Sequence, residues 1–297
     1  MLPVLIVCYL RPEKLRQILE SLVGSNRRIY IYIDRAPDQM RELNEEVHKV
    51  AREFAANLNI AIQSPVTNQG VKLGVPRGID WVLSIEKQII VVEDDCFPTQ
   101  HAYEYFDKSA PNLSKKVVMV CGTSPVGFQR NLNNRNLTYS NYPLIWGWAT
   151  SAENWAQLRV LIESSPPHKR IFKFLLMNPK KILVTCYFYA AAIRINRGKM
   201  QAWDALVALE MIISKYKSII PDKTLVTNTG RDDQANHFAQ DANLKDETVS
   251  RASIESASEI LDQSQEGLLH SNSNIERNVY NIRFRHLFSP FKALFGF

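Results

Sequence analysis

The stretch QIIVVEDDCFP, residues 88–98, places three consecutive carboxylates directly after an apolar run. A continuous run of Val and Ile is typical of a parallel strand that is covered on both faces. In open α/β sheets, ligands bind beyond the carboxyl ends of such strands. The stretch therefore predicts an α/β fold with an acidic site formed by Glu93, Asp94 and Asp95 at the carboxyl edge of its sheet.

These three acids point to a divalent cation. Adjacent carboxylates repel one another, and a bound cation offsets this repulsion. Carboxylate oxygens suit Mg²⁺ or Mn²⁺, which usually keeps waters and shares the phosphates of a substrate. We therefore expect a metal–diphosphate enzyme in which Asp95 binds the metal, while Asp94 and Glu93 hold nearby hydroxyls or waters. A solvated turn or a helix cap is the alternative, and the D-x-D pattern of aspartyl-nucleophile phosphohydrolases does not follow the first strand.

The bulk composition fits a globular protein with an anionic partner. The chain has 297 residues, of which 45% are hydrophobic, and a net charge of +6. This length suits one large domain or one domain with an appendage, and the basic excess suits an anionic ligand or surface. The sequence shows neither zinc-finger spacing nor a ribonucleoprotein-type motif, so nucleic acid is not an expected partner. The four cysteines are scattered, which fits a reducing compartment.

The first residues predict a strand and not a targeting signal. Residues 1–10 are apolar, but they lack a basic leader and a small-residue cleavage site, and Pro3 interrupts them. No apolar run approaches the roughly 20 residues that span a bilayer. We therefore expect a cytoplasmic protein.

Short strands alternate with helices over the first part of the chain. Such alternation predicts a Rossmann-type, mostly parallel sheet flanked by helices. Arg11 and Pro12 open the first helix, and Gly24 ends it. The expected strands are 3–9, 28–34, 59–63 and 88–92, and the next expected helices are 38–56 and 76–86.

The α/β pattern continues to about residue 238, where the composition changes. We accordingly expect a domain at 1–238, a polar linker at 239–275 and an aromatic-basic tail at 276–297. The later elements expected within the domain are a helix at 99–108, a strand at 117–121, a long loop at 125–145, a helix from WGWAT (146–150) to Leu161, a helix at 203–216 and a strand at 223–227.

The tail, residues 276–297, interleaves aromatic side chains with basic ones. This combination favours an interfacial segment that lies on an anionic membrane and brings the protein to a lipid-linked acceptor. The alternative is a segment that packs back on the domain or forms an oligomer contact. The aromatic residues are Tyr280, Phe284, Phe288, Phe291, Phe295 and Phe297, and the basic ones are Arg277, Arg283, Arg285 and Lys292.

Two further places suit contacts with a nucleotide. Asp34 closes the strand 28–34, where a carboxylate can accept hydrogen bonds from a base or a ribose. Helix capping is an equally good explanation for Asp34. Lys72 lies in the glycine-bearing loop 68–74, whose backbone N–H groups and lysine can meet a phosphate. An ordinary loop is the alternative there.

Aromatic and histidine side chains suggest contacts with a sugar and with the metal. Trp146 and Trp148 flank Gly147, and aromatic faces stack on sugar rings while glycine lets a ligand approach the backbone. Core tryptophans around a tight turn are the alternative. His237 follows a late polar loop and can complete a metal or diphosphate site, although a lone histidine is more often structural.

The order of these parts resembles the GT-A fold glycosyltransferases. The likeness is to the family-2-like bacterial enzymes and, more closely, to the N-acetylglucosaminyltransferase I group, and it covers about residues 1–238. The order and spacing of the pieces carry it together. They are PVLIVCYLRPEKLRQILESL, YIYIDR, the loop around Asn68 and Gly70, VVEDDCFP, WGWATSAENWAQL, AWDAL and TLVTNTGRDDQANHF.

The resemblance implies roles for the residues around the nucleotide. Asp95 would coordinate Mn²⁺ bound to the diphosphate of a UDP-sugar, and Asp94 would contact the ribose. Asp34 would lie on the uracil side, and Arg11 near the nucleotide.

The resemblance also implies a general base. An inverting transfer needs one base to deprotonate the acceptor hydroxyl and one Lewis acid to hold the leaving diphosphate. In the N-acetylglucosaminyltransferase I group the base follows a tryptophan, and Asp204 in AWDAL matches that position best. A helix N-cap is the alternative for Asp204. Glu153 and Glu210 are fallback bases.

These features together predict a metal-dependent glycosyltransferase. It would move a sugar from a UDP-sugar to a glycan hydroxyl with inversion, and a lipid-linked precursor of a bacterial surface polysaccharide is the expected acceptor. The protein would be cytoplasmic and peripheral on the inner face of the cell membrane. A sugar-nucleotide nucleotidyltransferase is disfavoured because residues 9–12 contain no glycine. A non-catalytic glycan-binding or scaffold protein on the same fold is the other alternative.

Overall fold

The structure of this chain, a computed structural model, describes residues 1–124 and 137–229. The expected polar linker at 239–275, the expected tail at 276–297 and His237 lie outside the described residues.

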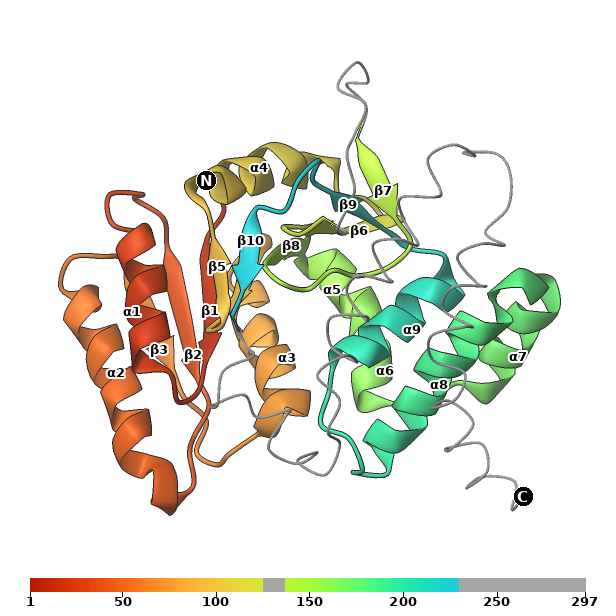
Figure 1. Cartoon of the computed structure of the whole chain (residues 1–297), viewed down its shortest axis with the longest axis horizontal. Coiled ribbons are helices and arrows are strands. Elements are labelled where there is room, and N and C mark those ends of the chain that lie inside the picture. The colour runs from red at the N-terminus through yellow and green to blue at the C-terminus, as the bar shows by residue number, and fades with distance from the viewer. Residues whose placement is uncertain (125–136, 230–297) are drawn as a thin grey trace.

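A mixed sheet of eight strands forms the centre of the described residues. The strands are β1 (Val4–Cys8), β2 (Ile29–Ile33), β3 (Ile60–Gln63), β4 (Gln88–Glu93), β6 (Val117–Cys121), β7 (Thr138–Ser140), β8 (Trp148–Ser151) and β9 (Lys217–Ile220), in the order β3-β2-β1-β4-β8-β6-β9-β7 (Figure 1). The first four strands are parallel, whereas β8 and β7 run against their neighbours. This confirms the predicted α/β fold with a mostly parallel sheet.

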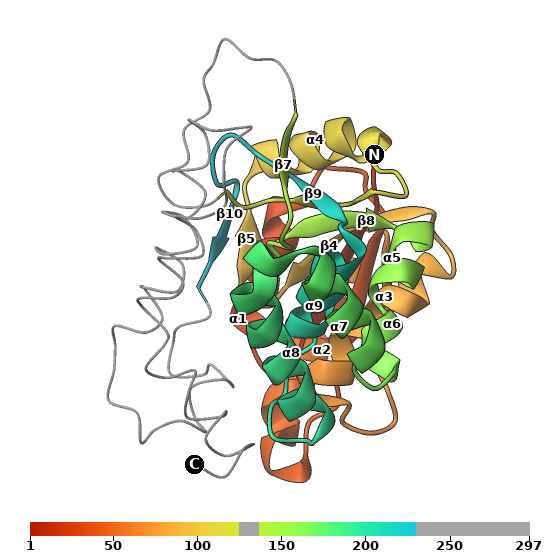
Figure 2. The same ribbon diagram turned by 90° about the vertical axis from the view of Figure 1, so that its right-hand side faces the viewer.

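Helices flank this sheet. They are α1 (Pro12–Ser21), α2 (Arg41–Ala55), α3 (Gly70–Leu83), α4 (Gln100–Ser109), α5 (Ala152–Leu158), α6 (Val160–Glu163), α7 (His168–Met177), α8 (Ile182–Asn196) and α9 (Asp204–Ser214). Helices α1 and α2 lie at one end of the molecule, and α7 and α8 at the other (Figure 1). Figure 2, viewed toward that second end, shows α7 and α8 facing the viewer.

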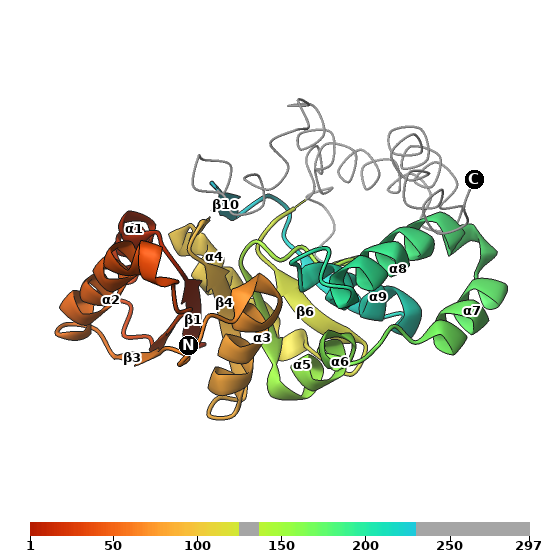
Figure 3. The ribbon, with the colours of Figure 1, turned by 90° about the horizontal axis from the view of Figure 1, so that it is seen from below.

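Alternate residues of β1 pack into two separate cores. Leu5 and Val7 join the core formed with α3, α5 and α9, whereas Val4 and Ile6 join the core formed with α1, α2 and α4. Figure 3 shows α1 and α3 on opposite sides of β1. A strand that is covered on both faces needs apolar residues at every position, which explains the continuous apolar runs in the sequence.

The helix expected at 76–86 begins earlier, as α3 at Gly70. The carboxylate of Asp34 accepts the backbone N–H groups of Gln69 and Gly70, which the first turn of a helix leaves without an intrahelical acceptor. Pro76 lies inside α3 and not at its start. A hydrogen bond from the end of a distant strand therefore sets this helix boundary.

The strand expected at 223–227 forms outside the main sheet. It is β10 (Val226–Asn228), which pairs antiparallel with β5 (Cys96–Pro98) in a sheet of two strands. This pairing sets Asn228 opposite Cys96. A late segment of the chain therefore lies beside the acids that follow β4.

The hydrophobic pattern does not predict α7 or α8. Helix α8, with the sequence ILVTCYFYAAAIRIN, is apolar around its whole circumference, so it lacks the periodicity of an amphipathic helix. Its 15 residues are fewer than the roughly 20 that cross a bilayer. Among residues 1–124 and 137–229, no helix combines the length and the apolarity that a membrane span requires.

Gly147 combines two constraints. Its φ is +64°, and a Cβ added there would lie 2.8 Å from Cγ2 of Val226. The side chain of Val226 thus packs against the backbone at Gly147, and the approach of a ligand there stays a prediction. Gly24 shares the first constraint, with a φ of +78°, but nothing lies within 4 Å of its added Cβ.

We therefore expect the two alanine variants to differ in stability. Gly147→Ala should lower the free energy of unfolding by about 2–4 kcal/mol, because a positive φ and overpacking act together. Gly24→Ala should lower it by only about 1 kcal/mol, from the positive φ alone. Urea denaturation measures both values. Equal losses would show that the contact with Val226 relaxes without cost.

Candidate active site

The acids at the end of β4 lie beside the end of β1. We call Glu93, Asp94 and Asp95 the acidic triplet. Because β4 and β1 are parallel neighbours, the triplet emerges at the same edge of the sheet as Tyr9 and Arg11. This is the edge at which open α/β sheets bind ligands.

Residues after β1 hold Asp94 in place. Nη1 of Arg11 lies 2.6 Å from Oδ1 of Asp94 and 3.3 Å from Oδ2 of Asp95. The backbone N–H of Tyr9 donates to Oδ2 of Asp94 at 3.1 Å. Burial raises the pKa of Asp94, and the charge of Arg11 opposes that rise. Both oxygens of Asp94 thus have donors, and Arg11 bridges two acids of the triplet.

Asp95 is the more open of these two acids. Its side chain is 21% exposed, against 8% for Asp94, and Nδ2 of Asn228 approaches its Oδ1 at 3.4 Å. The backbone N–H of Thr229 donates to the carbonyl oxygen of Asp95 at 2.8 Å, which fastens the end of β10 to the triplet. No role is predicted for Asn228 or Thr229 from the sequence, although a polar pair at the end of a strand is a usable signal.

Glu93 and Asp204 add further negative charge. Burial raises the pKa of Glu93 to about 8, the charges of Asp95, Asp204 and Asp94 add to that rise, and Arg11 opposes it. Asp204 is the first residue of α9. The structure therefore brings the expected general base within electrostatic reach of the acidic triplet.

The donor set suits a hard divalent cation that takes few protein ligands. Among residues 1–124 and 137–229, no group of three or more His, Cys, Asp and Glu side chains forms a complete metal cluster. Asp95 is nevertheless partly exposed, and burial together with the charges of Asp95, Asp204 and Asp94 raises the pKa of the neighbouring Glu93. Waters and substrate phosphates usually supply the remaining ligands of Mg²⁺ and Mn²⁺. The partly exposed carboxylate of Asp95 fits such an ion, and its role as the metal ligand stays a prediction.

Asp34 fastens the start of α3. Its carboxylate accepts the backbone N–H groups of Gln69, Gly70 and Arg35, each at 2.9 Å. Burial raises the pKa of Asp34, and these hydrogen bonds oppose the rise. This arrangement matches the capping interpretation, and the contact with uracil stays a prediction. Lys72 lies in the first turn of α3 and not in a loop, and its phosphate contact stays a prediction.

The structure places Trp148 in the core. It is 0% exposed, its ring stacks on Trp203 with 5.9 Å between centroids, and it also packs against Trp155. Protein side chains therefore cover the faces that sugar stacking requires, so the core interpretation fits Trp148. Trp146 is partly buried against the other core, and its sugar contact stays a prediction.

The two fallback bases lie away from the triplet. Glu153 is exposed at the start of α5, beside Gln88 at the opposite end of β4. Glu210 is buried, and its carboxylate pairs with Arg170 at 2.8 Å. Of the three candidate bases, Asp204 is the one whose charge acts on the triplet.

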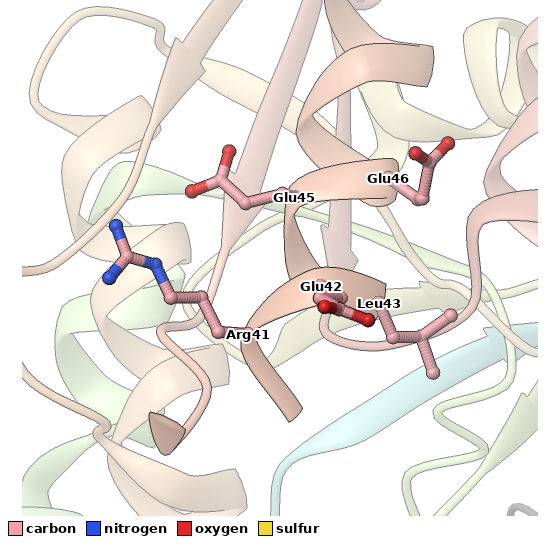
Figure 4. Close-up of a pocket in the computed structure, with 5 residues that line it drawn as sticks. All are labelled: Arg41, Glu42, Leu43, Glu45 and Glu46. Carbon is pink, nitrogen blue, oxygen red and sulfur yellow. The ribbon is translucent and has the colours of Figure 1, made fainter. Parts of the chain in front are cut away.

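Two surface hollows in the described residues are not lined by the triplet. Figure 4 shows one of them, formed by exposed side chains at the start of α2. The other lies at the amino end of β4, beside Lys87 and Gln88. The side chains that line the first hollow are Arg41, Glu42, Leu43, Glu45 and Glu46.

Comparisons with known proteins give likeness to solved structures only. No family model matches the chain, and no curated protein matches it. The chain is similar to the mannosyltransferase PcManGT from Pyrobaculum calidifontis in complex with GDP-Man and Mn²⁺, with 11% identity over 94% of this chain and 70% of that chain and a TM-score of 0.47.

Two further likenesses are weaker. The 4-diphosphocytidyl-2C-methyl-D-erythritol synthase from Anaerococcus prevotii has 11% identity over 80% of this chain and 96% of its own, with a TM-score of 0.37. Mouse xyloside xylosyltransferase 1 in its apo form has 10% identity over 72% of this chain and 82% of its own, with a TM-score of 0.36. At these identities, the functional assignment rests on the site itself.

The hydrogen bonds of Asp34 predict a structural role that can be measured. We expect Asp34→Ala to lower the free energy of unfolding by about 1–3 kcal/mol, because it removes the acceptor of three backbone N–H groups. Asp38→Ala, at an exposed position nearby, should change it by less than about 0.5 kcal/mol. Denaturation in guanidinium chloride, followed by circular dichroism, compares the two. If Asp34→Ala lowered the free energy of unfolding as little as Asp38→Ala, the structural role of Asp34 would be contradicted.

Proposed function

We propose that this chain is a metal-dependent glycosyltransferase that moves a sugar from a nucleotide-diphosphate donor, a UDP-sugar, to a hydroxyl of a glycan. The observation that supports the proposal is the gathering of the acidic triplet and Asp204 at the carboxyl end of a central parallel strand. The resemblance of the sequence to the GT-A fold enzymes points to the same class. So many carboxylates favour a substrate that arrives with a cation, as a nucleotide diphosphate does.

The triplet has the means to hold such a donor. Asp95 would bind Mn²⁺ or Mg²⁺, and a bound ion of this kind stabilises the negative charge of a leaving diphosphate. Asp94, fixed by Arg11 and the N–H of Tyr9, presents a rigid carboxylate to the ribose. Each carboxylate oxygen can accept a second hydrogen bond, so the ribose hydroxyls need not displace Arg11.

Asp204 would act as the general base. In a single displacement, the acceptor hydroxyl oxygen attacks the anomeric carbon while the bond from that carbon to the diphosphate oxygen breaks. Asp204 takes the hydroxyl proton, and the configuration at the anomeric carbon inverts. The position at the start of α9 suits this role, because the helix dipole favours an ionised carboxylate there. Glu93 would hold a sugar hydroxyl.

The acceptor we infer is a lipid-linked precursor of a bacterial surface polysaccharide. The net charge of +6 and the aromatic-basic composition of residues 276–297 support a place at an anionic membrane. The protein would then be cytoplasmic and peripheral on the inner face of the cell membrane, with its catalytic domain at 1–238.

Calorimetric titration with UDP tests the metal site. We expect UDP to bind in the presence of Mn²⁺ and not in EDTA, and Asp95→Asn to weaken the Mn²⁺-dependent binding by at least about tenfold. Glu153→Gln, at the other end of β4, serves as the control and should bind like the unaltered chain. An affinity for UDP that changes neither in EDTA nor in Asp95→Asn would refute the metal assignment. Absence of binding to any nucleotide sugar, in a folded sample, would favour the glycan-binding or scaffold alternative.

Asp204→Asn tests the base. We expect this variant to lower kcat by about 10²–10⁴-fold while the affinity for the nucleotide changes little, because only proton transfer is lost. Release of UDP from the donor sugar in the presence of acceptor measures kcat, and Glu153→Gln again serves as the control. Full activity of Asp204→Asn would exclude it as the base. If Asp204→Asn instead weakens nucleotide binding and leaves kcat unchanged, Asp204 belongs to the donor site.

A further inference from the structure

One long stretch of the chain is basic without any acid. Residues 164–203 contain eight Lys and Arg and no Asp or Glu, although the whole chain has 30 acids against 36 Lys and Arg. In the structure this stretch forms α7, a turn at Pro179–Lys181 and α8, which we call the α7–α8 hairpin. The basic residues are Lys169, Arg170, Lys173, Lys180, Lys181, Arg194, Arg197 and Lys199.

The outward face of α7 carries apolar side chains among the basic ones. Phe172 is 65% exposed and Leu176 is 68% exposed. Lys169 and Lys173 are also exposed, and their spacing of three and four residues sets them on the same face of the helix as Phe172 and Leu176. The opposite face of α7 packs into the core. The helix therefore exposes a mixed apolar and basic face where a polar one is usual.

The exposed apolar surface continues toward α8. Met177 is 68% exposed and Ile182 is 50% exposed, and Lys180 lies between them in the turn. Of the thirteen large apolar side chains that are exposed in residues 1–124 and 137–229, four lie between residues 172 and 182. Exposed apolar residues are ordinary when scattered, but a group of them marks an interaction surface.

Helix α8 also has apolar side chains that are not fully buried. Its side chains are apolar around the whole helix, yet most of them are only partly buried. Such a helix is expected inside a core or in contact with lipid. The hairpin lies at the end of the molecule that is farthest from α1 and α2 (Figures 1 and 2). It is therefore placed to meet a flat surface.

We propose that the α7–α8 hairpin seats this protein on a membrane that contains anionic lipids. Phe172, Leu176 and Met177 would enter the boundary between headgroups and acyl chains, as the apolar faces of interfacial helices do. The lysines beside them would lie against anionic headgroups, each adding to the attraction. Nucleic acid would satisfy the charge but leave the apolar side chains in water. A second copy of the chain would bring a face of the same positive charge.

The hairpin is close in sequence to the candidate active site. Helix α8 packs against α9, and α9 begins at Asp204. A membrane-bound hairpin would hold the acidic edge of the sheet near hydroxyls carried by lipids. The membrane proposal itself stands on the surface of the hairpin and does not depend on the proposed sugar transfer.

Vesicle flotation with the full chain tests the proposal. We expect the protein to float with vesicles of phosphatidylcholine mixed with phosphatidylglycerol and not with phosphatidylcholine alone, and high salt to weaken the binding. Two hairpin variants should each lose at least about tenfold in binding. One reverses charge, with Lys169→Glu, Lys173→Glu and Lys180→Glu. The other removes apolar surface, with Phe172→Ser, Leu176→Ser and Met177→Ser.

Matched variants at exposed positions elsewhere are the controls, and they should bind like the unaltered chain. Thermal unfolding checks that every variant is folded. The charge control is Lys87→Glu, Lys115→Glu and Lys223→Glu. The apolar control is Val23→Ser, Met40→Ser and Val66→Ser.

Loss of binding in both hairpin variants, with both controls intact, would support the proposal. Undiminished binding of both hairpin variants would overturn it and place any membrane contact elsewhere in the chain. Loss in the charge variant alone would also overturn it, because the hairpin would then be a general anion-binding surface that suits nucleic acid equally. A dimer seen by light scattering would also overturn the proposal, if the apolar variant dissociates the dimer but still binds vesicles.

Discussion

Concentrated negative charge at the carboxyl end of β4 is the constraint on which this edge of the molecule depends. A buried carboxylate is costly unless it is paired, and here the buried Asp94 stands between two partly exposed acids, Glu93 and Asp95. Arg11 bridges Asp94 and Asp95, and it can do so because β1, the strand before it, is the parallel neighbour of β4. Burial raises the pKa of the neighbouring Glu93 to about 8, and the charges of Asp95, Asp204 and Asp94 add to that rise. A cation that arrives with an anionic substrate would complete the balance.

Strand β8 and the tryptophans packed around it position Asp204 at that edge. Strand β8 runs antiparallel between β4 and β6, which carries Trp148 into the core. There Trp148 stacks on Trp203, the residue directly before Asp204. A buried aromatic stack is stiff and well packed, so it fixes the start of α9 relative to β4. The tryptophans thus act on the site through position, although the sequence suggested contact with a sugar for one of them.

The sequence could reveal what is local and could not reveal what depends on distant partners. The strands at 4–8, 29–33 and 88–93 follow their predicted bounds closely, because burial on both faces leaves a continuous apolar run. The start of α3 depends on Asp34, which follows β2 and is separated from α3 by α2 and β3. Tryptophans look the same in a sequence whether they pack in a core or stack on a sugar. Helix α8 escaped prediction because an all-round apolar helix has no periodicity to detect. The place of the triplet, in contrast, required only the rule that ligands sit at strand ends, whereas Asp204 was expected from the resemblance to the GT-A fold glycosyltransferases.

The distribution of charge links the two proposals. An acidic edge that works beside an anionic membrane would be repelled by it, and a nucleotide diphosphate would add to that repulsion. A cation at Asp95 offsets part of this charge locally, but surface charges act over about 8–10 Å at physiological salt. The stretch 164–203, which contains the hairpin and ends at the residue before Asp204, would supply the remaining attraction, because it has eight basic residues and no acid. One of the eight, Arg170, is paired with Glu210. Apolar side chains on the same face then make the attachment less sensitive to salt than charge alone would. A segment with both features is what an acidic site requires if its acceptor is carried by a lipid.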